Sequence, residues 1–66
     1  MSQDIQDFIT GLREKMAEEK VDSDVQESLI DEILTEYEMV PGNIREIAWA
    51  VLVNAGFLGL ANEATR

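Results

Sequence analysis

Residues 43–60 constrain the fold more than any other stretch of this sequence. They contain the only tryptophan, Trp49, and the longest uninterrupted apolar run, residues 47–53. If this stretch is helical, apolar side chains lie almost all round it, whereas an ordinary surface helix buries a single stripe. One flanking layer would leave much of it in water, so we expect this helix to be central in the fold or shared between two chains.

Signals at both ends define the limits of this central helix. Asn43 is a favoured N-cap residue, and Glu46 stands three positions later, where it completes a capping box. Gly56 can take the left-handed conformation that commonly follows a helix, and Phe57 can then pack back on the last turn. The sequence therefore predicts a helix over residues 44–55.

Two amphipathic helices are expected before it. Apolar residues recur at three- and four-residue spacing over residues 3–20 and again over residues 24–38, with acidic residues opposite them. Ser23 and Gln26 form a second capping-box pattern between these segments. The short connection predicts that the two helices pack antiparallel as a hairpin. We expect Gly11, inside the first helix, to be tolerated rather than to mark close packing.

The remaining segments complete the expected fold. Pro41 and Gly42 end the second helix in a turn. Residues 58–65, interrupted by Gly59, form either a short fourth helix or a tail that orders on a partner, and we expect the helix. The sequence thus predicts an all-α fold with one domain over residues 1–66. This domain is a small three-helix bundle of a helical hairpin and an apolar central helix, with a short fourth helix.

Composition argues against most enzyme chemistry. Cysteine and histidine are absent, so the chain lacks a thiolate nucleophile, the commonest metal ligand and the usual general base. Its scattered glycines form no phosphate-binding loop, and the segment that begins at Asp22 lacks the glycine and the final glutamate of a calcium loop. Adjacent carboxylates belong to outward faces, without the dry pocket that shifts a pKa. We expect no catalytic residue, metal or cofactor.

No targeting or membrane segment is expected. Residues 1–4 carry no basic region, so the N-terminus resembles neither a signal peptide nor a transit peptide. The apolar run over residues 47–53 is far shorter than the roughly 20 residues that a membrane span requires. We therefore expect a cytoplasmic protein that does not contact membranes.

Charge is unevenly distributed along the chain. The sequence has 14 acidic and 5 basic residues, for a net charge of −9. Residues 1–40 hold 12 of the acidic and 3 of the basic residues. Binding to phosphate backbones depends on Lys and Arg, so we expect no direct binding of nucleic acid. A helix-turn-helix reader is disfavoured for the same reason, because its recognition helix would carry one base, Arg45.

This charge pattern favours a non-enzymatic binding protein that inhibits or modulates a partner protein. Carboxylates on rigid helices imitate the spacing of phosphates and attract clusters of Lys and Arg. The partner we expect is a nucleic-acid-binding enzyme of a host or of a defence system, by analogy with small acidic phage proteins. The alternative explanation of the charge is solubility alone. The expected partner-binding acidic face consists of Asp24, Glu27, Asp31, Glu32, Glu36 and Glu38.

The second hypothesis is a structural or assembly subunit that acts through self-association of its apolar C-terminal third. Burying a large apolar side chain is worth about 1.5 to 3 kcal/mol, so leaving several of them in water is unfavourable. A two-fold homodimer with the central helix at its interface removes that cost. The residues expected to mediate self-association are Ile44, Ile47, Trp49, Leu52, Val53, Phe57 and Leu58.

Overall fold

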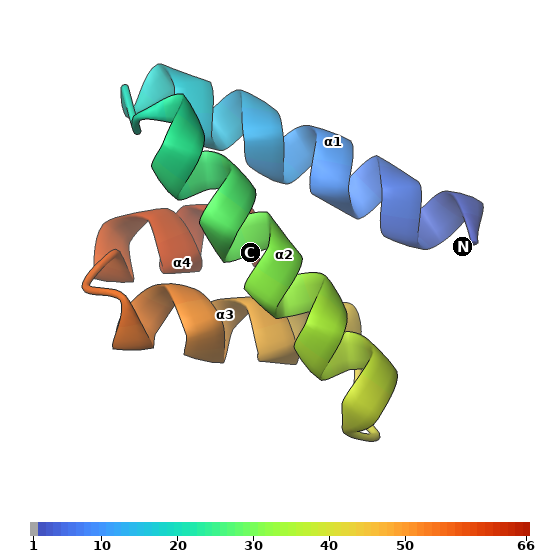
Figure 1. Ribbon diagram of the computed structural model, residues 1–66. Coiled ribbons are helices and arrows are strands. Elements are labelled where there is room, and N and C mark those ends of the chain that lie inside the picture. Colours follow the sequence, from blue (N-terminus) through green and yellow to red (C-terminus); the bar gives the residue numbers. More distant parts are fainter. Residues whose placement is uncertain (1) are drawn as a thin grey trace.

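The computed structural model describes residues 2–66 and folds them into four helices and no strand. In chain order these helices are α1, Gln3–Glu18; α2, Ser23–Met39; α3, Ile44–Asn54; and α4, Leu58–Ala64 (Figure 1). The expected all-α class is confirmed. Residues 58–65, for which the sequence allowed either a short helix or a tail, form the helix α4 over Leu58–Ala64.

The limits of α1 follow from hydrogen bonds at its two ends. The Ser2 side-chain oxygen accepts a hydrogen bond from the amide of Ile5 at 3.3 Å and so caps the first turn. At the other end Lys20 has a left-handed backbone with φ 59°, and the Val21 amide donates to the Met16 carbonyl at 3.0 Å. This Schellman arrangement stops the helix two residues before its predicted end.

The start of α2 differs from the prediction. Asp22 occupies the N-cap position instead of Ser23, and no side chain caps the helix there. The backbone amide of Gln26 donates to the Asp22 carbonyl at 2.9 Å, which begins the helical ladder one residue early. The side-chain amide of Gln26 donates to the Val21 carbonyl at 2.7 Å. The predicted Ser23 capping box is therefore wrong, because Gln26 is already bonded to the connection between the helices.

A proline turn joins α2 to α3. Val40 is extended, with φ −121° and ψ 131°, which is the conformation that a residue before proline favours. Met39 and Val40 are both exposed at this turn. The turn therefore ends α2 as the sequence predicted and leaves two apolar side chains in solvent.

Asn43 as the N-cap of α3 and Gly56 as the left-handed residue after it are confirmed, whereas the return bond of the capping box, to the Glu46 side chain, is not formed. Oδ1 of Asn43 accepts a hydrogen bond from the amide of Glu46 at 2.9 Å. At the other end Gly56 has φ 93°, and the Phe57 amide donates to the Leu52 carbonyl at 2.9 Å. This is a Schellman motif, and it reverses the chain into α4.

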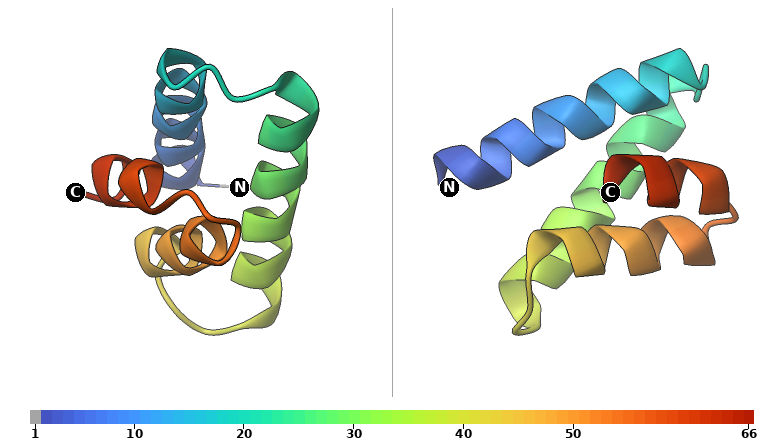
Figure 2. Two further views of the ribbon diagram at one scale, coloured as in Figure 1. Left: turned by 90° about the vertical axis from the view of Figure 1, so that its left-hand side faces the viewer. Right: turned by 180° about the vertical axis from the view of Figure 1, so that it is seen from behind.

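The four helices are not arranged as a closely packed hairpin with a third helix added. α1 and α2 meet at their shared turn and diverge from it, while α4 runs back beside α3 (Figures 1 and 2). α2 packs mainly on α3, and α1 contacts α4 more than it contacts α2. The predicted antiparallel packing of the first two helices is thus limited, because α4 provides the main contact of α1.

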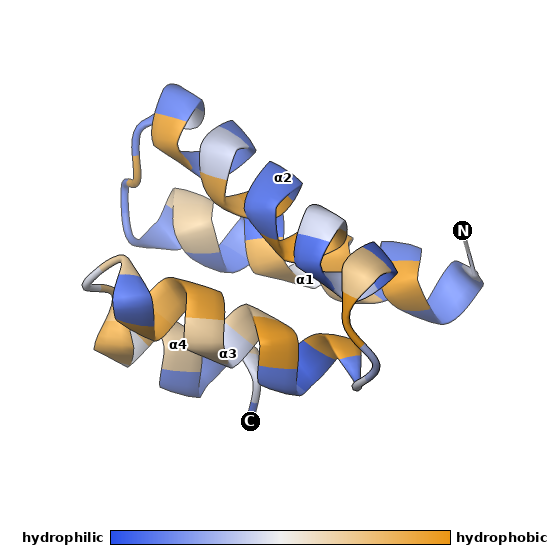
Figure 3. Cartoon of the chain, turned by 60° about the horizontal axis from the view of Figure 1, so that its bottom comes forward, coloured by the Kyte–Doolittle hydropathy of each residue, from blue (hydrophilic) through white to orange (hydrophobic). Residues whose placement is uncertain are grey.

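One apolar core draws on all four helices, and their apolar sides face one another (Figure 3). α4 contributes two of its residues to this core, and within residues 2–66 no polar side chain is buried. α3 is therefore covered by α2 and by α4 rather than by one layer. The buried residues are Ile5, Ile9, Leu12, Met16, Leu29, Ile30, Ile33, Ile44, Ala48, Val51, Leu52, Leu60 and Ala61.

Two glycines should respond to alanine in opposite ways. Gly11 lies inside α1 with open space where a Cβ would be, so Gly11→Ala should stabilise the fold by up to about 1 kcal/mol. Gly56 has φ 93°, so Gly56→Ala should destabilise it by roughly 1 kcal/mol or more. Urea unfolding followed by circular dichroism measures both changes. A loss of stability in Gly11→Ala would mean that this exposed side of α1 is covered in solution.

Candidate functional site

The exposed side of α2 is rich in acidic residues. The helix carries six carboxylates and no Lys or Arg, and all six are exposed. Asp24, Asp31 and Glu38 follow one another at seven-residue intervals, which keeps them on the same side of a helix. We call this surface the acidic face. It consists of Asp24, Glu27, Asp31, Glu32, Glu36 and Glu38.

The placement of these charges does not favour the stability of α2. Asp24 lies in the first turn, where a negative charge interacts well with the helix dipole. Glu36 and Glu38 lie near the C-terminus, where a negative charge is unfavourable, and the last turn contains no base. Glu32 and Glu36 are also four residues apart, a like-charge spacing that costs a few tenths of a kcal/mol. The acidic face therefore has a cost in helix stability.

One carboxylate of the acidic face is paired. The Arg13 guanidinium of α1 donates to the carboxylate of Glu27, and both side chains remain largely exposed. This hydrogen bond, together with the positive charge of Arg13, lowers the pKa of Glu27 below its ordinary value. The pair joins α1 to α2 close to their shared turn. Among residues 2–66 the other five carboxylates of the acidic face form no ion pair.

The apolar residues predicted for self-association do not form one surface. Ile44 and Leu52 are buried within the chain's own core, so these two act in folding and are out of a partner's reach. Three others are partly buried against that core, namely Ile47, Val53 and Phe57. Trp49 and Leu58 remain open to solvent, with 41% and 55% of their surface exposed.

Trp49 links α3 to α4 at the surface. Its indole nitrogen donates a hydrogen bond to Oδ1 of Asn62 at 3.0 Å. The ring borders a shallow pocket of about 210 Å³, whose other walls include Arg45 and Thr65. The exposed part of the ring is thus an apolar surface with its polar atom already bonded, which suits contact with another apolar surface.

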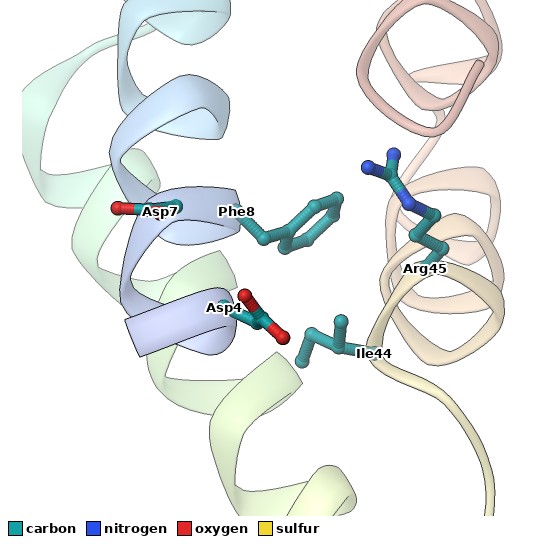
Figure 4. Close-up of a pocket in the computed structure, with 5 residues that line it drawn as sticks. All are labelled: Asp4, Asp7, Phe8, Ile44 and Arg45. Atoms are coloured by element: carbon teal, nitrogen blue, oxygen red, sulfur yellow. The ribbon is translucent and has the colours of Figure 1, made fainter. Parts of the chain in front are cut away.

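A second pocket, of about 450 Å³, lies between α1 and α3 (Figure 4). The Arg45 guanidinium lies 5.4 Å from the centre of the Phe8 ring, within the range of a cation–π interaction. Asp4 points into the space between the helices, whereas Asp7 points away and accepts a hydrogen bond from the Gln3 side chain at 2.9 Å. The pocket is therefore lined by two carboxylates, one guanidinium and an aromatic ring, and only the Asp4 carboxylate is turned into it.

A third pocket, of about 310 Å³, lies between the first turn of α1 and the last turns of α2. Its walls include Ile5, Leu34 and Tyr37, with Glu38 of the acidic face at its edge. Sequence reasoning did not identify this pocket, because Leu34 and Tyr37 read as ordinary members of the apolar stripe. The neighbouring acid at Glu38 was the one signal that this part of the stripe borders the charged surface.

Residues 2–66 contain no group of three or more carboxylate, cysteine or histidine side chains placed to hold a metal ion. None of the helices in this range has the length and apolar character needed to cross a membrane.

Comparisons with protein-family models, with curated proteins and with solved structures found no match to this chain.

The Glu27 carboxyl should titrate at a lower pH in the wild-type protein than in Arg13→Gln. Its folded-state pKa is lowered, so the pair adds stability above the ordinary glutamate pKa and loses it as the pH falls through the lowered value. Carbon-detected NMR of the side-chain carboxyl measures this difference, with Lys15→Gln as the control on the same helix. Identical titration of Glu27 in the wild type and in Arg13→Gln would contradict the pairing.

Proposed function

We propose that this chain is a non-enzymatic binding protein whose acidic face docks on a basic surface of a partner protein and inhibits or modulates it. The observation that carries the proposal is the composition of α2, with six exposed carboxylates and no base along its length. Electrostatic attraction of this kind speeds the encounter with Lys and Arg clusters and selects against acidic partners.

The charge density of α2 suits a partner that normally binds nucleic acid. A helix of 17 residues is about 25 Å long, so six carboxylates give roughly one negative charge every 4 Å. One strand of a DNA duplex carries a phosphate about every 3.4 Å. A protein groove whose Lys and Arg bind the phosphates of one DNA strand would therefore find negative charges at a similar spacing along this helix. Direct binding of the chain to nucleic acid is not part of the proposal.

Solubility alone is a weaker explanation of the acidic face. Net charge keeps a protein soluble wherever on the surface the charges lie. In this chain α2 holds six of the 14 acidic residues and none of the 5 basic ones, and two of its acids lie near its C-terminus without a compensating base. Acidic residues at such positions lower the stability of the helix. Their presence is expected where a binding surface is needed at a cost in stability.

Reversing part of the acidic face should abolish capture of the partner. We expect the variant with Asp31, Glu36 and Glu38 changed to Lys to retain less than a tenth of the partner that the wild type captures from the organism encoding it. The matched control reverses three exposed acids in or directly after α1, Glu14, Glu18 and Glu19, which changes the net charge equally.

That capture is compared at about 50 and 200 mM salt, because screening weakens attraction between exposed charges. We expect the wild type to lose most of its partner at the higher salt, and the α1 control to behave like the wild type. Capture that survives both the reversal and the higher salt would refute the role of the acidic face.

A second candidate function, assembly through self-association, rests on the exposed apolar groups of α3 and α4. Trp49 and Leu58 are exposed on the part of the chain after residue 40, where acidic and basic residues are equal in number. Two copies with a net charge of −9 each repel one another least where this neutral part meets itself. The corresponding assembly is a two-fold homodimer.

Trp49→Asp tests the homodimer. If two copies meet through this surface, the variant should sediment as a folded monomer at concentrations where the wild type sediments as a dimer. Met39→Asp is the control, because Met39 is the most exposed large apolar side chain in residues 2–66 and is the last residue of α2, outside the apolar part of α3 and α4. A wild-type protein that is monomeric at about 100 μM, by sedimentation or light scattering, would count against self-association.

A further inference from the structure

One side of α2 has both acidic and apolar residues, and it leads to the third pocket at the C-terminal end of the helix. Four residues share that side because they are spaced at i, i+4, i+7 and i+11 along the helix. At the end near the shared turn, Glu27 forms an ion pair with Arg13 of α1. At the other end, the row borders the third pocket. The four residues are Glu27, Asp31, Leu34 and Glu38.

The third pocket exists because α1 and α2 diverge from their shared turn (Figures 1 and 2). At the wide end Ile5 faces Leu34 and Tyr37 across a space of about 310 Å³. This volume lies at the lower end of the roughly 300 to 1,000 Å³ range of ligand pockets, so it is large enough to receive a large apolar side chain. Within residues 2–66 the Tyr37 hydroxyl has no hydrogen-bond partner, so it is free to bond to a ligand.

We propose that this pocket receives an apolar side chain from a basic amphipathic helix of the partner protein. The inference rests on the proposed function of the acidic face, and it adds the feature that selects one basic partner from others. Asp31 and Glu38 flank Leu34 at three- and four-residue spacing, so each can pair with a Lys or Arg next to the inserted side chain.

Charge complementarity identifies the occupant. A second copy of this chain has a net charge of −9, which Asp31 and Glu38 would repel, and α2 has no base to offset that repulsion. An uncharged apolar segment would leave both carboxylates unused. A helix with an apolar side and basic flanks matches the pocket and its edge together, in the manner of helix-in-groove recognition.

Two synthetic peptides separate the apolar contact from the charges. Both are 16-residue helices with Lys at the same positions, and they differ only at two positions that these Lys flank, Leu in one and Ser in the other. We expect the Leu peptide to bind the wild-type protein about tenfold more tightly at 50 mM salt, because burying one large apolar side chain is worth roughly that factor.

Leu34→Ala should remove the difference between the two peptides, whereas Met39→Ala should retain it. Met39 is an exposed apolar residue at the same end of α2 but does not line the pocket. A second measurement needs no variant. Methyl NMR of the wild-type protein should show that the Leu peptide shifts the signals of Ile5 and Leu34 and that the Ser peptide leaves them in place.

The outcomes distinguish this inference from the proposed function. Equal affinity of the two peptides for the wild type would overturn the apolar contact and leave the acidic face as the binding surface. A preference for the Leu peptide with methyl shifts confined to residues around Trp49 would also overturn it. Failure of both peptides to bind at 50 mM salt would count against the acidic face as well.

Discussion

The fold depends on the reversal of the chain at Gly56, because this reversal lays α4 against α3. A helix that is apolar on most sides needs cover from more than one neighbour. α2 covers one side of α3, and α4 covers another through Leu60 and Ala61, which are both buried. α4 also contacts α1. A helix of seven residues thereby closes the core between the first helix and the third.

Local signals predicted the helices because caps act over three or four residues. Asn43 caps the start of α3 and Gly56 follows its end, as expected, and the apolar stripe of α1 is buried as expected. The failures have physical causes outside such short patterns. Lys20, just after α1, has a left-handed backbone conformation, which the presence of a lysine does not predict. Asp22 and Ser23 are both residue types suited to the N-cap of α2, and the bonds of Gln26 to the Asp22 and Val21 carbonyls decide between them.

The candidate site was predictable where it depended on periodicity alone. The six carboxylates of α2 are exposed because they lie opposite its apolar stripe or along the border of that stripe. The self-association residues were harder to predict, since α4 covers much of α3 and takes Leu52 into the chain's own core. The third pocket depends on the divergence of α1 from α2. That divergence follows from the contact of α1 with α4, which no local pattern in α1 or α2 encodes.

The position of the acidic face follows from how the core is closed. A domain of this size has a margin of only about 3 to 5 kcal/mol from its core, so unfavourable charges must lie where their repulsion is weakest. Because α4 packs against α3 and α1, the outward side of α2 faces solvent, where water and salt screen its carboxylates. Arg13 offsets one of them, through its pair with Glu27 near the turn where the two helices meet. Toward the wide end the repulsion is not offset by a base, and a basic partner would relieve it there.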